Sequence, residues 1–148
     1  MKNKFLSILL FLLINKMFFF SVNSAEQFNF DVTEIEVLQN GNIIKGLKKG
    51  TVNTNDGIII TADTFVYEKL LNILTATGNV EIEDTNKNLK IYSKNIIYNK
   101  KEEIITTNKN SKAVYEKNKF IYADSFKFNR NENILKASGN VEIKDTLK

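Results

Sequence analysis

The chain has 148 residues, with 21 lysines and arginines against 17 aspartates and glutamates, a formal net charge of +4, and no histidine, cysteine or proline. The lack of histidine and cysteine excludes serine–histidine and cysteine–histidine nucleophiles, the usual zinc ligand sets, disulfides and lipoprotein acylation. The length is sufficient for one domain with its own core.

Residues 1–24 have the layout of a secretory signal peptide: a basic start, an apolar run and small residues before a predicted cut after Ser24 or Ala25. The alternative is a retained membrane anchor. Asn15 and Lys16 interrupt the run before it reaches the roughly 18–20 apolar residues that a spanning helix needs. We therefore expect an exported chain whose folded part is 25–148.

Export changes how the charge is interpreted. Three of the 21 basic residues lie in the leader, which leaves 18 basic against 17 acidic residues and a net charge of +1. The folded part also has no basic stripe with interleaved aromatic residues, the pattern typical of nucleic-acid binding. We expect no nucleic-acid partner.

After the leader the chain repeats itself. Residues 62–85 match residues 123–146 without a gap, 61 positions later, and 14 of the 24 positions are identical. A weaker match at half that distance relates residues 60–67 to residues 91–98. A fixed period marks a stack of one small structural unit. We predict four units of about thirty residues, beginning near positions 28, 58, 90 and 120.

The second half of each unit alternates apolar and polar residues. One face is shared by Leu74, Ala76, Val80 and Ile82. The later copy repeats the alternation from Leu135 to Ile143. Period two with one apolar face predicts a strand with one buried side. Gly78, which lies inside this run, predicts a bulge, a bend or a close backbone approach.

The first half of each unit alternates less cleanly. Counting in steps of two places Ile59 on the face of Phe65, and Phe120 on the face of Phe126. Polar turns follow, and Asn40-Gly41 is a further hairpin signal. The pattern predicts about eight short antiparallel strands, two per unit, and no helical stripe after the leader.

An all-β fold follows from this pattern. A single flat sheet would leave its apolar face in water, so the sheet must fold over on itself. We predict a twisted, two-walled, jelly-roll-like sandwich that is open at both ends. Units that contact mainly their neighbours leave a free strand edge at each end.

The repeated residues also carry a family resemblance. Both copies contain A-D, N-I-L, A and G-N-V-E-I at the same spacing, from Ala62 to Ile82 and from Ala123 to Ile143. They resemble the OstA-like repeat of the lipopolysaccharide-transport proteins, found in LptA-type bridge proteins and in the periplasmic N-terminal domain of LptD-type outer-membrane proteins. The resemblance covers essentially everything after the leader.

The resemblance implies a twisted open β-jelly-roll in the periplasm of a Gram-negative envelope. Its apolar interior would hold the lipid A acyl chains of lipopolysaccharide. Like domains would join edge to edge, so the implied partners are other OstA-like transport proteins or a second copy of the chain. An LptD-type chain would be associated with the outer membrane, and its domain would be the front piece of a longer protein. The sequence leaves open whether Lys148 is the natural end.

On this basis we expect a lipid-facing surface on the inner side of the strands. Buried methylene groups contribute roughly 0.8 kcal/mol each, so an apolar trough shields acyl chains without any chemistry. The alternative is an exported structural β-repeat module whose apolar side chains fill a dry core, as they usually do. The predicted lipid-binding residues are Phe65, Tyr67, Leu74, Val80, Ile82, Ile96, Tyr98, Phe126, Phe128, Leu135, Val141 and Ile143.

Catalysis, metal binding and cofactors are not expected. Asp63 and Asp124 could form the carboxylate pair of a glycosidase. However, both belong to the repeat, which favours a structural task such as bonding turn amides. Asp56 and Asp84 are interpreted as turn residues because the spaced acidic run of a calcium loop is missing.

Overall fold

The structure, a computed structural model, describes residues 28–146, and the predicted signal peptide lies outside them. Among the described residues no helix is long and apolar enough to cross a membrane. Within residues 28–146 the one helical element is the short 3-10 helix η1 (Gln39–Gly41). The strands are β1 (Asn29–Val32), β2 (Ile35–Leu38), β3 (Ile43–Gly46), β4 (Gly50–Asn53), β5 (Ile58–Ala62), β6 (Thr64–Glu68), β7 (Ile73–Asp84), β8 (Leu89–Asn99), β9 (Ile104–Asn108), β10 (Ser111–Tyr115), β11 (Lys119–Ala123), β12 (Ser125–Asn129), β13 (Ile134–Ser138) and β14 (Glu142–Asp145).

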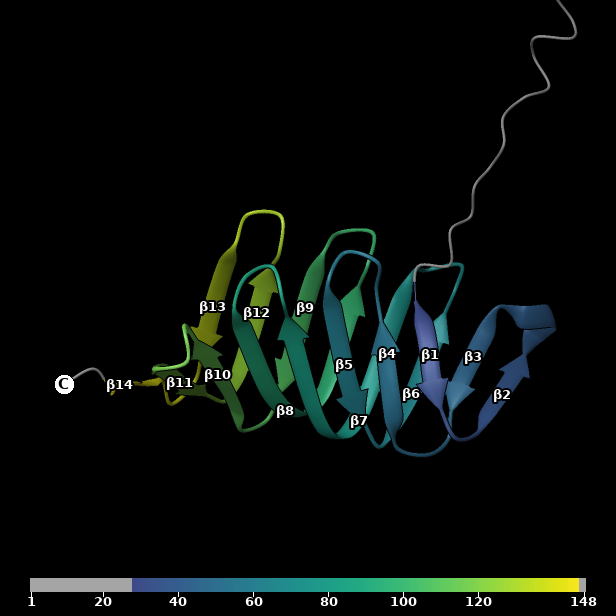
Figure 1. The fold of residues 1–148 in the computed structure, drawn as a ribbon, viewed down its shortest axis with the longest axis horizontal. Helices are drawn as coiled ribbons and strands as arrows, with labels where there is room; N and C mark the ends of the chain where they lie inside the picture. Colours follow the sequence, from purple (N-terminus) through teal and green to yellow (C-terminus); the bar gives the residue numbers. More distant parts are fainter. Residues whose placement is uncertain (1–27, 147–148) are drawn as a thin grey trace, which may run out of the picture.

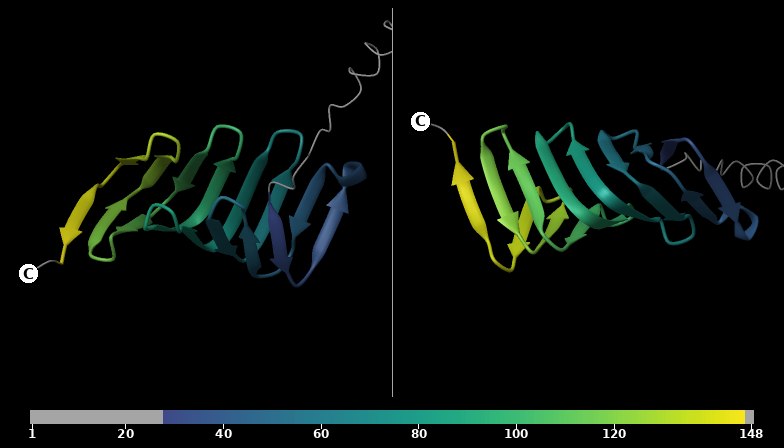
Figure 2. Two further views of the ribbon diagram at one scale, coloured as in Figure 1. Left: turned by 45° about the horizontal axis from the view of Figure 1, so that its top comes forward. Right: turned by 90° about the horizontal axis from the view of Figure 1, so that it is seen from below.

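These fourteen strands form one open antiparallel sheet with two walls (Figure 1). The first wall has the order β1-β4-β5-β7-β8-β10-β11-β14, and the second wall has the order β2-β3-β6-β7-β8-β9-β12-β13. Strands β7 and β8 run through both walls, and the turned views show the walls facing each other along the length of the molecule (Figure 2).

The strand count differs from the prediction, and the reason is the bend between the walls. The chain makes eight passes, two per unit, as expected, but six of them are each divided into two strands at the bend. The units begin where predicted, since β5, β8 and β11 start at residues 58, 89 and 119. The fold is the predicted open β-jelly-roll.

The repeated A-D and G-N residues build the bend. The Asp63 backbone N–H donates to the Gly78 carbonyl at 2.9 Å, and the Asn79 side-chain amide donates to the Asp63 carboxylate at 2.8 Å. Gly78 has a φ of +79°, and an added Cβ would lie 2.3 Å from Asp63 Oδ2. The second copy repeats this arrangement at Asp124. The repeated aspartates therefore have a structural task, although they accept from a side-chain amide and not from turn amides.

The bend also reverses the alternation, which corrects one prediction. Ile60 pairs with Ile82 in register and is buried, whereas Ile59 is 37% exposed on the outer side. Phe65 is nevertheless buried, because residue 63 at the bend shifts the count by one. Phe120 likewise faces outwards, opposite Lys144, and does not share the face of Phe126.

Candidate functional site

The twelve predicted lipid-binding residues fall into two groups. Nine of them are at most 5% exposed and pack between the walls, where they form the core: Phe65, Tyr67, Leu74, Val80, Ile82, Ile96, Tyr98, Phe126 and Phe128. The other three lie towards the C-terminal end of the trough. Leu135 is partly buried, while Val141 and Ile143 are 50% and 69% exposed.

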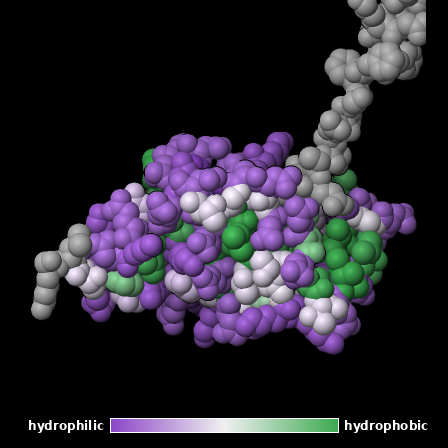
Figure 3. Space-filling view, in the orientation of Figure 1, coloured by the Kyte–Doolittle hydropathy of each residue, from purple (hydrophilic) through white to green (hydrophobic). Residues whose placement is uncertain are grey.

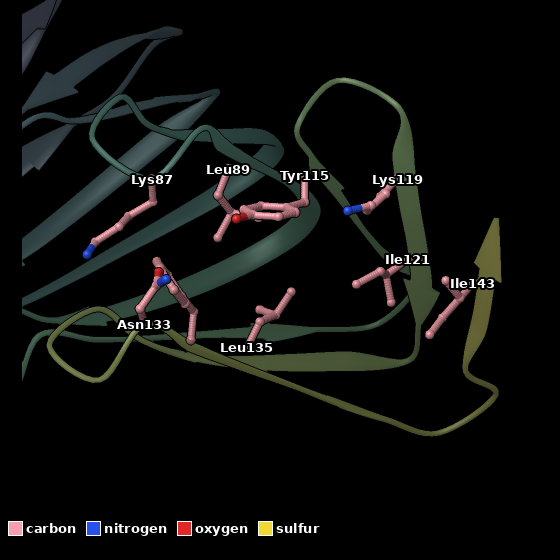
Figure 4. Close-up of a pocket in the computed structure, with 9 residues that line it drawn as sticks. Lys87, Leu89, Tyr115, Lys119, Ile121, Asn133, Leu135 and Ile143 are labelled. Atoms are coloured by element: carbon pink, nitrogen blue, oxygen red, sulfur yellow. The ribbon is translucent and has the colours of Figure 1, made fainter. Parts of the chain in front are cut away.

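An open apolar groove occupies this C-terminal end. It has a volume of about 280 Å³, and its lining includes Leu89, Phe128, Leu135 and Ile143 (Figure 4). Leu135 and Ile143 come from β13 and β14, on opposite walls. The groove is therefore an uncovered continuation of the core between the two walls.

Cationic and polar side chains border this groove. Lys87, Lys119 and Asn133 line it together with the apolar residues, and Figure 4 shows them around its edge. Lys119 is held by Glu116, whose carboxylate accepts from Nζ at 2.9 Å. The apolar walls are suited to the hydrocarbon part of an anionic amphiphile, and the lysines at the border are suited to its anionic head.

The opposite end of the trough is also uncovered. Ile35 and Val37 on β2 are 51% and 57% exposed, and Figure 3 shows a hydrophobic patch over the β2–β3 end. In register, Val37 pairs with Ile44, which pairs with the core residue Tyr67. Both ends of the inner face thus present apolar residues beside the outermost strands of the described sheet.

Between the two ends, the trough is closed. Phe28 precedes β1 of the first wall and is buried, and its ring lies edge-on to two tyrosines of the second wall. The ring centroids are 4.8 Å apart for Tyr67 and 5.6 Å for Tyr98. Such edge-to-face pairs favour a fixed contact between the walls.

A cluster of ionic side chains, which we name the rim cluster, joins the walls next to Phe28's partner Tyr98. Its members are Asp56, Asp84, Lys100, Glu103 and Arg130. Asp56 and Asp84 belong to the first wall, while the other three belong to the turns at the edge of the second wall.

Arg130 makes most of the ionic contacts between the walls. Its Nε donates to Asp84 Oδ2 and its Nη1 to Asp56 Oδ2, both at 2.9 Å, and Nη2 donates to the Asp56 carbonyl at 3.2 Å. Lys100 Nζ also reaches Asp56 Oδ2, at 2.5 Å. The Arg130 and Asp84 side chains are 8% and 1% exposed, so this ion pair is withdrawn from water.

The second wall holds its own cations in place. Arg130 and Lys100 both contact Glu103, and the Tyr98 hydroxyl donates to Glu103 Oε2 at 2.7 Å. Burial, followed by this hydrogen bond, raises the pKa of Tyr98 well above its usual range. Tyr98 therefore remains a neutral donor within the cluster.

The ion pairs also set the protonation of Asp56. Burial opposes its charge, but hydrogen bonds from Lys100, Thr54 and Arg130 hold the pKa of the Asp56 carboxyl well below its usual range. For Arg130, burial acts to lower the pKa, and the bonds to Asp84 and Asp56 outweigh it and raise the pKa. Asp56 and Arg130 are thus both ionised at neutral pH.

Sequence reasoning missed the rim cluster. Asp56 and Asp84 were interpreted only as turn residues, and Arg130 was given no role. Two signals were present: Arg130 is the sole arginine of the sequence, and Asp84 occupies an inward position at the end of the alternating run that contains Ile82. A planar guanidinium suits a buried ion pair better than a lysine does.

The remaining chemistry of the described residues is limited. Residues 28–146 contain no group of three or more carboxylate, histidine or cysteine side chains that could hold a metal ion. A second polar cluster, Ser93, Thr107 and Ser111, is buried at the bend. The Ser111 hydroxyl bonds to the hydroxyls of both Ser93 and Thr107, and Thr107 Oγ1 accepts from the Phe126 N–H.

No family model matches the chain, and no curated protein matches it. Among solved structures, it is similar to LptH of Pseudomonas aeruginosa, the LptA-homologous periplasmic component of a lipopolysaccharide-transport device. The TM-score is 0.72 with 12% sequence identity, over 81% of this chain and 95% of that chain. The fold is therefore of the LptA type, as the resemblance implied, and the neighbour that shares it is a transport component and not an enzyme.

Proposed function

We propose that this chain is a periplasmic carrier or bridge domain that shields the lipid A acyl chains of lipopolysaccharide on their way to the outer membrane. The observation that carries the proposal is the open apolar groove between Leu135 and Ile143 at the C-terminal end of an LptA-type trough. The same proposal covers a stand-alone LptA-like bridge and the N-terminal part of an LptD-like protein.

The groove suits a lipid with an anionic head. Each methylene that leaves water contributes roughly 0.8 kcal/mol, so even part of one acyl chain placed against Leu89, Phe128 and Leu135 is held without directional bonds. The lysines at the border, Lys87 and Lys119, can meet phosphate groups as point charges. A neutral apolar ligand would leave both lysines unused.

The bridge function rests on the two ends of the sheet. Strands β1 and β2 end the described sheet on one side, and β13 and β14 end it on the other. Their outer edges offer backbone groups for pairing with another OstA-like domain or a second copy. The exposed apolar residues at both ends, such as Val37 and Ile143, would then be covered as the inner faces become continuous.

The alternative, a structural β-repeat module with a dry core, also has an observation in its favour. Nine of the twelve predicted residues belong to the buried core, and of these nine only Phe128 also lines the open groove. For the other eight the carrier proposal requires that the walls separate. For Phe128, Leu135 and Ile143, which line the groove, and for the exposed Val141, which does not line it, no movement is required.

The test is site-specific photocrosslinking in a Gram-negative envelope. A photoreactive side chain at Ile143 faces the groove, and one at Lys144, the next residue, faces the outer side and is the matched control. Under the proposal, lipopolysaccharide adducts form at position 143 and not at position 144. Equal yields, or no adducts at 143 in a folded protein, would favour the dry-core module.

A further inference from the structure

The rim cluster lies directly beside the groove. Lys87 and Asn133, which line the groove, follow Asp84 and Arg130 by three residues in the same two turns. Asp84 also pairs in register with Leu89, another groove residue. The ion pair between the walls is therefore the boundary at which the open groove ends and the sealed core begins.

The cluster is built so that each wall keeps a partner if the contact is broken. On the second wall, Arg130 and Lys100 remain next to Glu103. On the first wall, the Asp84 carboxylate also accepts from the Asn86 N–H at 3.1 Å. If the walls separated, neither wall would be left with a buried charge that has no hydrogen-bond partner. Such an uncompensated charge is what makes most buried ion pairs hard to break.

We propose that the rim cluster is a gate, which keeps the central trough closed in the empty protein and opens when an acyl chain advances from the groove. The inference rests on the proposed carrier function and concerns its regulation. The apolar gain of filling the trough would oppose the wall-to-wall ion pairs, so a ligand shifts the equilibrium by binding only the open form. Water-filled opening without a ligand exposes the core and is disfavoured.

The experiment measures the distance between the two walls. Because the chain has no cysteine, Asn55→Cys and Asn131→Cys place two spin labels at exposed positions in the turns on opposite sides of the gate. Dipolar spectroscopy should give one short distance for the empty protein. With purified lipopolysaccharide, a longer distance between the two labels should appear and saturate. Photocrosslinking at Ile143, carried out in the same doubly labelled protein, reports binding in the groove.

A matched pair of variants tests the cause. Asp84→Asn removes a gate charge, whereas Glu83→Gln removes the neighbouring charge, which pairs with Lys90 on the outer face. Asp84→Asn should lower the lipopolysaccharide concentration for half-maximal opening about fivefold or more, a modest coupling on the usual scale. Glu83→Gln should leave that concentration unchanged.

The outcomes separate the two proposals. Adducts at Ile143 with an unchanged distance at saturation would overturn the gate and leave the carrier function standing. No adducts and no change in distance would overturn both. The ligand titration uses the unaltered rim cluster. It therefore tests whether the walls separate on binding even if Asp84→Asn fails to fold.

Discussion

Asp84 and Arg130 lie 46 residues apart in the sequence and on opposite walls of the trough, and a 2.9 Å bond joins Asp84 Oδ2 to Arg130 Nε. The bond spans the opening of a two-walled sheet whose walls are also in contact through apolar and aromatic side chains and through the ion pairs of Asp56. The structure thus places an ionic contact where the trough changes from sealed to open.

Removal of Arg130 should destabilise the protein strongly. Arg130→Met leaves Asp84 nearly inaccessible to water without its countercharge, and breaking such a pair typically costs about 3–5 kcal/mol. The measurement is the free energy of unfolding in urea. The control is Lys48→Met, which breaks an exposed pair with Glu34 and should have little effect. Equal effects of the two substitutions would contradict the burial argument.

Acid should weaken the rim cluster through Asp56. Its pKa is lowered from the ordinary 3.8 because Lys100 and Arg130 bond to its carboxylate. The other two carboxylates of the rim cluster are Asp84 and Glu103. The stabilisation is therefore complete above the unfolded value and is lost as the pH falls below 3.8 towards the folded value. Unfolding free energies of the wild type and of Asp56→Asn should differ by a constant amount from pH 7 to pH 5 and converge in stronger acid. A difference that disappears between pH 7 and pH 5 would disprove this assignment.

Alanine at Gly78 should be poorly tolerated for two reasons. The φ of +79° costs roughly 1–2 kcal/mol for a residue with a Cβ, and that Cβ would also collide with the Asp63 carboxylate. Gly41 has a φ of +89° but no heavy atom within 4 Å of an added Cβ, so Gly41→Ala isolates the backbone cost. Thermal unfolding should rank Gly78→Ala below Gly41→Ala. If Asp63→Ala fails to reduce the gap, the steric argument is wrong.

A charge in the groove should weaken lipid binding without unfolding the chain. Ile143→Asp alters a residue that is 69% exposed, so the melting temperature should hold while affinity for lipopolysaccharide falls about tenfold or more, equivalent to about 1.4 kcal/mol. Ile134→Asp, on the outer side of β13 and 43% exposed, is the matched control. Displacement of a fluorescent amphiphile measures the affinity of both variants. Similar losses of affinity in the two variants would argue against the groove as the site.

The sequence predicted the fold correctly because its signals are local. The alternation from Leu74 to Ile82 follows from the two faces of a strand, and the glycine at position 78 marks the bend at which the walls meet. The repeat then multiplies these signals, so eight passes and four units could be counted without coordinates. The error at Ile59 has the same origin, since a bend that shifts the count by one residue is invisible to a rule of strict alternation.

Sequence alone therefore determined the all-β architecture, the repeat and the inner faces of most strands, because each depends on neighbours within one hairpin. Only the tertiary structure decided which part of the inner face is sealed and which is open, as Phe65 and Ile143 have the same inward orientation but different cover. It alone assembled the rim cluster, whose contacts between the walls link residues 44 to 74 positions apart. Such contacts depend on how closely the two walls approach, and no local pattern encodes that distance.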